Sequence, residues 1–196
     1  MKIKYYSNLI FISILLTSST YGQELKFGFG GGLSTISNDN SGLSYNAGYH
    51  LSAKAKLEIP LIPFKPVAFI QYYVMNGSFS YTSSVGNVSV NASQKIFSFG
   101  FGGEFALIPG PISPYIAVDF GYNNIGEIKF DTPIVSKSLT SSISRTGLDI
   151  GAGIELAIPF FVTFDASVKY NMLNLFGKQG GESSVSAINL NLSVLF

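Results

Sequence analysis

The last nine residues of the chain, Ile188-Asn-Leu-Asn-Leu-Ser-Val-Leu-Phe196, alternate between apolar and polar side chains almost without exception. Leu195 is the one departure from the alternation. A period of two residues predicts a β-strand that has one apolar face and one polar face. The apolar face of this strand is formed by every second residue: Ile188, Leu190, Leu192, Val194 and Phe196.

Seven further stretches alternate in the same way, and no stretch between residues 23 and 196 has the period of an amphipathic helix. Eight strands without helices predict an all-β fold, an eight-stranded antiparallel up-and-down β-barrel. The seven stretches are Leu25–Thr35, Ser44–Ile59, a strand beginning after Pro66, Phe97–Leu107, Ile116–Tyr122, Leu148–Ile158 and Val162–Met172.

The connections between the predicted strands fall into a short and a long class. Three of them carry an Ile-Pro pair about fifty residues apart, at Ile59-Pro60, Ile108-Pro109 and Ile158-Pro159. Proline cannot donate a hydrogen bond to a β-ladder, so these pairs predict short turns. The other connections are longer and more polar, and we expect loops at Ser37–Leu43, Asn76–Gln94, Asn124–Thr146 and Asn174–Ser184. Transmembrane barrels have this asymmetry, with short turns toward the periplasm and long loops toward the outside.

The composition favours a membrane protein that crosses the bilayer with strands. Only 12% of the 196 residues are charged and 46% are hydrophobic, whereas soluble domains carry about 25% charged residues. No segment after residue 22 has the 18 or more consecutive apolar residues of a membrane-spanning helix. The chain has no cysteine and no basic patch, so we expect neither disulfides nor nucleic-acid binding.

The first 22 residues have the pattern of an export signal. Lys2 and Lys4 precede a short apolar run, Leu9–Leu16, and small residues follow as far as Gly22. We therefore expect residues 1–22 to be a cleaved signal peptide and residues 23–196 to form the barrel domain.

The two faces of the strands differ sharply in charge. No charged residue lies on the apolar face within the part of any strand that would span a bilayer. The alternation alone would also fit a soluble barrel turned inside out. The long loops, the terminal phenylalanine and the tyrosines near the loop-side strand ends favour a lipid-facing apolar surface. These tyrosines are Tyr45, Tyr72, Tyr122 and Tyr170.

On these features the chain resembles the small eight-stranded outer-membrane barrels of Gram-negative bacteria, the OmpA/OmpX-like and PorT-like proteins with an outer membrane protein beta-barrel domain. The resemblance rests on the strand number, the loop asymmetry and the alternation that ends at Phe196. It implies residence in the outer membrane, contact with outer-membrane lipids, and reading of the closing strand by the barrel-assembly machinery as an assembly signal. We expect no cofactor, because no residue pattern of a cofactor site is present.

Candidate sites in the sequence are few. His50 is the only histidine and, with no cysteine present, a metal site is not expected. His50 could serve a lipid-modifying enzyme together with a serine and a carboxylate, but its inward position favours a structural role. Gly28–Leu33 and Gly100–Glu104 are glycine-rich, yet no helix follows either segment, so they are not phosphate-binding loops.

Charged residues of both signs fall on the inward face of the predicted strands. The interior of an eight-stranded barrel is about filled by its own side chains, and a buried charge needs a partner. We therefore expect a polar network in the lumen, with a narrow pore or ligand pocket as the alternative. Its expected members are Lys54, Lys56, Glu104, Asp119, Glu155, Asp165 and Lys169.

The sequence thus predicts a non-enzymatic outer-membrane barrel with a structural or surface-interaction role. A narrow pore or transport accessory is the alternative, and a lipid-modifying enzyme using His50 is the third possibility. No catalytic, cofactor-binding or metal-binding residues are assigned.

Overall fold

The computed structural model describes residues 23–38, 48–83, 86–131, 136–138, 141–158 and 162–196. No helix in these ranges is long and apolar enough to cross a membrane. The described residues form ten strands: β1 (Glu24–Asn38), β2 (Gly48–Glu58), β3 (Phe64–Ser83), β4 (Gly86–Ala106), β5 (Ile112–Ile125), β6 (Lys129–Asp131), β7 (Ser136–Ser138), β8 (Ile143–Ala157), β9 (Thr163–Phe176) and β10 (Val185–Leu195).

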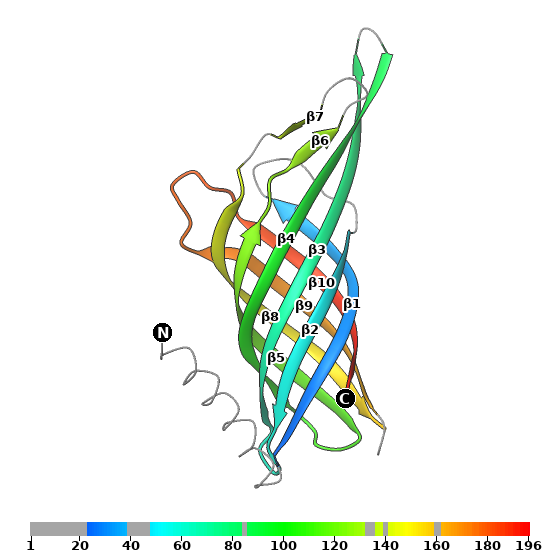
Figure 1. Ribbon diagram of the computed structural model, residues 1–196, viewed down its shortest axis with the longest axis vertical. Coiled ribbons are helices and arrows are strands. Elements are labelled where there is room, and N and C mark those ends of the chain that lie inside the picture. Colours follow the sequence, from blue (N-terminus) through cyan, green and yellow to red (C-terminus); the bar gives the residue numbers. More distant parts are fainter. Residues whose placement is uncertain (1–22, 39–47, 84–85, 132–135, 139–140, 159–161) are drawn as a thin grey trace, which may run out of the picture.

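Eight of these strands close into a barrel (Figure 1). Each pairs antiparallel with the next along the chain, with β8 taking the place beside β5. The ring closes where β1 pairs with β10, for example at Gly28 opposite Leu195. The two short strands β6 and β7 extend the sheet from the edge of β4 and lie outside the ring. The predicted all-β, eight-stranded antiparallel up-and-down barrel is therefore confirmed.

The outward face of the barrel is apolar, as the alternation predicts. On β5 the outward residues Ile116, Val118, Phe120 and Tyr122 remain 43–49% exposed, whereas the residues between them are buried. Tyr72 and Tyr170 also lie on this face, while Tyr45 falls outside the described residues. On β4, Gly103 leaves a gap that the ring of Phe64 covers.

The two ends of the barrel differ as expected, with one correction. Short turns join β2 to β3 and β4 to β5 at one end, the short-turn end, where the C-terminus also lies (Figure 1). At the opposite, long-loop end, the loop predicted at Asn76–Gln94 is wrong. This segment is a hairpin in which β3 and β4 stay paired as far as Ser83 and Gly86, and it projects beyond the other strands (Figure 1). The loop predicted at Asn124–Thr146 likewise contains β6 and β7.

The closing strand fits its sequence pattern at every described position. Phe196 exchanges two backbone hydrogen bonds with Phe27 of β1, at 2.8 and 3.1 Å. Leu195, the exception to the alternation, points inward and is 1% exposed. Its side chain fills the space above Gly28, where a Cβ atom would lie 2.9 Å from Leu195 Cγ. A large inward residue is thus accommodated by a glycine on the neighbouring strand.

Candidate functional site

The lumen near the short-turn end is filled by charged side chains, which we call the charged layer. They come from β1, β2, β3, β4, β5, β8 and β9, and most of them are buried. Its lysines are Lys26, Lys54, Lys56, Lys65 and Lys169, and its carboxylates are Glu58, Glu104, Asp119, Asp149, Glu155 and Asp165.

Lys56 is the centre of the charged layer and is completely buried. Its ammonium forms ion pairs with Glu104 of β4 and Glu155 of β8, and it lies 3.5 Å from Asp165 Oδ2 of β9. None of these strands is a neighbour of β2 in the sheet. The ion pairs therefore cross the lumen and join opposite walls of the barrel.

Three other lysines extend the charged layer, Lys54 on the inner side of Lys56 and Lys65 and Lys26 toward the rim. Lys54 Nζ lies 3.0 Å from Asp165 Oδ2. Lys65 bridges Glu155 and Glu58, with Nζ 3.0 Å from Glu58 Oε1. Lys26 Nζ lies 2.9 Å from the second oxygen of Glu58. Lys65 is absent from the predicted network because the sequence pattern places the start of the third strand after Pro66, whereas β3 begins at Phe64.

A second group lies deeper in the barrel. Lys169 Nζ is 2.5 Å from Asp119 Oδ2, and Asp149 is the residue directly opposite Asp119 on the neighbouring strand β8. Both aspartates are at least 95% buried. All seven residues expected in the lumen network thus lie inside the barrel, and each of them takes part in an ion pair.

Inward glycines make room for the large side chains of the lumen. A Cβ atom on Gly153 would lie 2.5 Å from the Tyr115 hydroxyl, which itself donates a hydrogen bond to Asp165 (3.0 Å). A Cβ atom on Gly102 would lie 2.1 Å from Asp119 Oδ1. Gly102, in the glycine-rich segment of β4, and Gly153 of β8 therefore leave space for large polar side chains of the lumen.

Above the charged layer the lumen carries amides and hydroxyls. Asn189 donates hydrogen bonds to Asn171 and to the Tyr73 hydroxyl, both at 2.9 Å. His50 lies in the same region, with Nδ1 2.7 Å from Ser34 Oγ. Such a pair is one part of a serine hydrolase site. Here both residues are 1% exposed, so a lipid substrate could not reach the hydroxyl.

The carboxylates of Glu104, Glu155 and Asp165 are close enough together to be considered as metal ligands. The Lys56 ammonium contacts two of them and approaches the third. A positive charge already occupies the position that a cation would take, and it would repel a metal ion. The residues present do not fit a metal site.

Toward the long-loop end the lumen contains a second, apolar cluster of buried side chains, which we call the apolar layer. Met75 and Ile96 are completely buried at its centre, on β3 and β4. This cluster does not follow from the alternation and was not predicted. Among the described residues, the apolar layer consists of Ile36, Tyr73, Met75, Ala92, Ile96, Ile125, Ile128, Leu173, Val185 and Ala187, with Ile143 packed against it.

The comparison with known proteins agrees with this geometry. The sequence matches the outer membrane protein beta-barrel domain over residues 9–196, and the chain belongs to that family. The barrel is therefore a transmembrane barrel, and its apolar outer face contacts lipid. No curated protein sequence matches the chain.

Several solved structures share the fold at low sequence identity. Neisserial surface protein A (NspA) is 17% identical, with a TM-score of 0.59 and coverage of 89% of this chain and 97% of its own. Ail of Yersinia pestis, crystallised with the heparin analogue sucrose octasulfate, is 20% identical, with a TM-score of 0.53 and coverage of 89% and 99%. A major outer membrane protein of Thermus thermophilus is 12% identical, with a TM-score of 0.52 and coverage of 88% and 100%.

Proposed function

We propose that this protein is a closed, non-enzymatic barrel of the outer membrane that acts as a structural or surface-interaction protein. The observation that carries the proposal is the filled lumen. Ion pairs join opposite walls at Lys56, and the apolar layer follows above them along the same axis. A hydrated ion would have to disrupt buried ion pairs and then cross an apolar region, and both steps are unfavourable.

A function in interaction would be carried by the long-loop end. The β3–β4 hairpin projects there (Figure 1), and among the described residues β3 pairs with β2 only as far as Val74. Beyond this point the edge of β3 pairs with no other described strand, which is the geometry in which a partner can add a strand. Loops and hairpins on a rigid scaffold commonly carry function.

A sulfated ligand like the one in the Ail crystal is less well supported. The exposed basic residues at the long-loop end, such as Lys95 and Lys129, are interspersed with acidic ones, such as Glu127 and Glu182. No strong field of one sign results, and such a field is what attracts a polyanion.

A liposome-swelling assay separates the closed barrel from the pore. Liposomes that contain the folded protein should not swell in glycine or in sucrose, as protein-free liposomes do not. Swelling in glycine that increases with protein content would favour the narrow-pore alternative. Lipid A from cells that express the parent protein or His50→Ala should be identical in mass, because no enzymatic role is proposed for His50.

We further propose that residues 1–22 are removed as a signal peptide, that the short-turn end faces the periplasm, and that the assembly machinery reads the closing strand. Ile188, Leu190, Leu192 and Phe196 lie on its outward face, which supports a shared recognition surface. Phe196→Asp should lower the yield of heat-modifiable barrel in the outer membrane, whereas Phe196→Tyr should not. Equal yields would argue against the assembly signal.

A further inference from the structure

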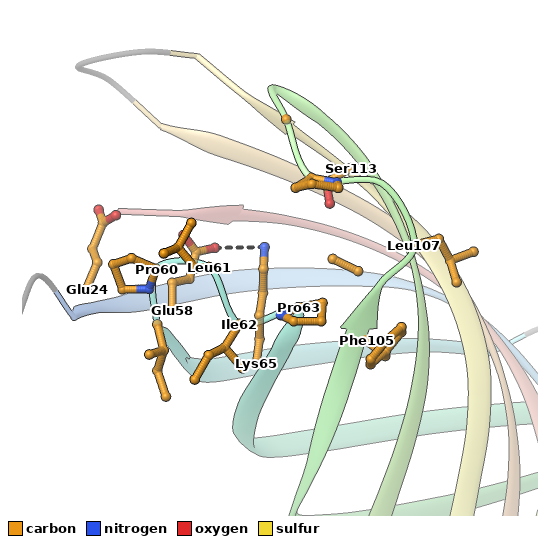
Figure 2. Close-up of a pocket in the computed structure, with 14 residues that line it drawn as sticks. Glu24, Glu58, Pro60, Leu61, Ile62, Pro63, Lys65, Phe105, Leu107 and Ser113 are labelled. Atoms are coloured by element: carbon orange, nitrogen blue, oxygen red, sulfur yellow. Dashed lines mark hydrogen bonds and ion pairs between the residues drawn. The ribbon is translucent and has the colours of Figure 1, made fainter.

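The mouth of the barrel at the short-turn end holds a cavity of about 700 Å³, which we call the vestibule (Figure 2). Its sides are the turn between β2 and β3 and the turn between β4 and β5. Glu58 and Lys65 form an ion pair at its inner side, and Glu24 lies next to them (Figure 2). The volume is that of a small-molecule site.

The vestibule is amphipathic. Its inner side has both signs of charge, with Lys65 and Glu58 paired at 3.0 Å. The Glu24 carboxylate is less well compensated, since its side chain is 64% exposed and Lys26 Nζ lies 3.7 Å away. The outer side of the vestibule includes Phe105 and Leu107, which also belong to the lipid-facing surface of β4 and the turn after it. The vestibule is therefore continuous with the surface that contacts lipid.

The depth of the vestibule matches the headgroup region of a bilayer. The outward apolar residues of β5 run from Ile112 to Tyr122. Ten residue steps of about 3.3 Å on a strand tilted by about 40° give a height of about 25 Å, which is the height of the apolar band in such barrels. Ile112 thus lies near the lower edge of the hydrocarbon layer, and the neighbouring turns lie among the headgroups.

One residue of the turn has an unusual conformation that supports a lipid contact. The Ile59 carbonyl accepts a hydrogen bond from the Ile62 amide at 3.1 Å, and Leu61 between them has a φ of 65°. Glycine or asparagine usually occupies this position of a turn. The Leu61 side chain is nevertheless fully exposed in the protein alone, at 104%, and it lines the vestibule. An apolar side chain held there at a conformational cost fits a contact with lipid.

We propose that the vestibule binds a phospholipid of the ethanolamine type from the periplasmic leaflet. The headgroup ammonium would lie at the Glu24 carboxylate, and the acyl chains along Leu107 and Phe105. An ethanolamine ammonium can donate hydrogen bonds to a carboxylate, whereas the quaternary amine of choline cannot. The choice of leaflet rests on the proposed orientation of the barrel, but the binding site itself does not.

The test is native mass spectrometry of the protein purified from outer membranes in non-ionic detergent. N-terminal sequencing of the same sample identifies the first residue of the mature chain, which lies close to Glu24. The protein is titrated with phosphatidylethanolamine, phosphatidylcholine and phosphatidylglycerol that have identical acyl chains. We expect the ethanolamine lipid to bind about fivefold more tightly than the choline lipid, as one charge-assisted hydrogen bond at a partly exposed site supports.

Three variants make the result specific to the vestibule. Glu24→Gln should reduce binding of the ethanolamine lipid to the level of the choline lipid. Glu127→Gln, the same chemical change on an exposed residue at the long-loop end, should leave the preference unchanged. Leu61→Gly should weaken the binding of the ethanolamine lipid and of the choline lipid by a similar factor, because it removes an apolar contact but no charge.

The proposal is overturned by equal binding of the ethanolamine and choline lipids, by tighter binding of the glycerol lipid, or by a preference that survives Glu24→Gln. A soluble apolar peptide containing lysine that binds more tightly than the ethanolamine lipid under the same conditions would also overturn it, since the site would then belong to a periplasmic protein. All these measurements are made on the folded barrel in detergent, so they do not depend on conductance or on the orientation in the membrane.

Discussion

The two halves of the lumen are filled by opposite chemistry. The charged layer joins the walls of the barrel by ion pairs at the short-turn end, for example between Lys56 and Glu155. The apolar layer at the long-loop end packs Met75, Ile96 and Leu173 with no more than 1% exposure. Buried ion pairs tolerate the loss of one partner poorly, whereas an apolar cluster loses stability in proportion to the cavity that is created. The difference predicts how each half responds to mutation.

The largest loss is expected from Lys56→Gln in the charged layer. The change leaves Glu104 and Glu155 buried without their common cation, which should lower the free energy of unfolding by about 3–5 kcal/mol. Urea titration of the barrel in lipid vesicles measures this change in the free energy of unfolding. Lys178→Gln, at an exposed loop position, is the matched control and should have little effect. Equal stability of the two variants would show that the charged layer is open to water.

The apolar layer should respond to Ile96→Ala, because the side chain is completely buried. Loss of about 3 kcal/mol is expected from the cavity it leaves, against about 1 kcal/mol for Ile96→Val. The same titration gives both values. A loss for Ile96→Ala no larger than that for Ile96→Val would mean that the long-loop end of the lumen is loosely packed.

The outer face provides a smaller effect, from Ala55→Arg. From the alternation alone, Ala55→Arg would be expected to cost more than Lys56→Gln, because Ala55 faces lipid and Lys56 the lumen. The structure favours the reverse order, since Lys56 is held by three carboxylates while Ala55 makes no ion pair and is the fourth residue from the short-turn end of its strand. A lipid-facing charge costs about 1 kcal/mol at the interface and roughly 2–4 kcal/mol at mid-bilayer, so about 2 kcal/mol is expected at this intermediate depth. Ala55→Leu, which keeps the surface apolar, should be neutral. A larger loss for Ala55→Arg than for Lys56→Gln would restore the order expected from the sequence.

The smallest effect is expected outside the membrane, at Glu182 in the loop between β9 and β10. Hydrogen bonds from Arg145, the shorter at 2.7 Å, lower the pKa of this carboxyl to about 2 from its usual 4.5. Because the folded-state pKa is lowered, the contribution to stability is present above about pH 4.5 and is lost as the pH falls toward 2. Glu182→Gln should therefore differ from the parent at pH 6 and resemble it at pH 2. A difference that persists at pH 2 would exclude the carboxylate as its source.

The barrel and the direction of its side chains could be predicted from the sequence because they depend only on the alternation of apolar and polar residues along each strand. Every residue of the closing strand from Ile188 to Val194 points as the alternation requires. The ion-pair partners could not be predicted in this way. Lys56 reaches Glu104 and Glu155 across the lumen, and such contacts depend on the register and tilt of strands that are not neighbours.

The apolar layer escapes prediction for a different reason. The run Tyr72-Tyr73-Val74-Met75 is apolar at every position, so that both faces of the strand carry apolar side chains. This is the pattern of a strand buried on both faces. Similarly, the many serines and asparagines of segment 76–94 indicate a loop, although its β-branched and aromatic residues favour a hairpin. In the hairpin the two strands continue beyond the other strands of the barrel (Figure 1), where the contrast between lipid and lumen no longer shapes the sequence.

The central claim is that the charged and apolar layers together close the barrel. Electrical recording of the purified protein in planar bilayers tests it most directly. We predict no steady conductance in the parent protein at any salt concentration. Stable current steps whose conductance is the same in every insertion and increases with salt concentration would contradict the account, because ions would then pass through both layers.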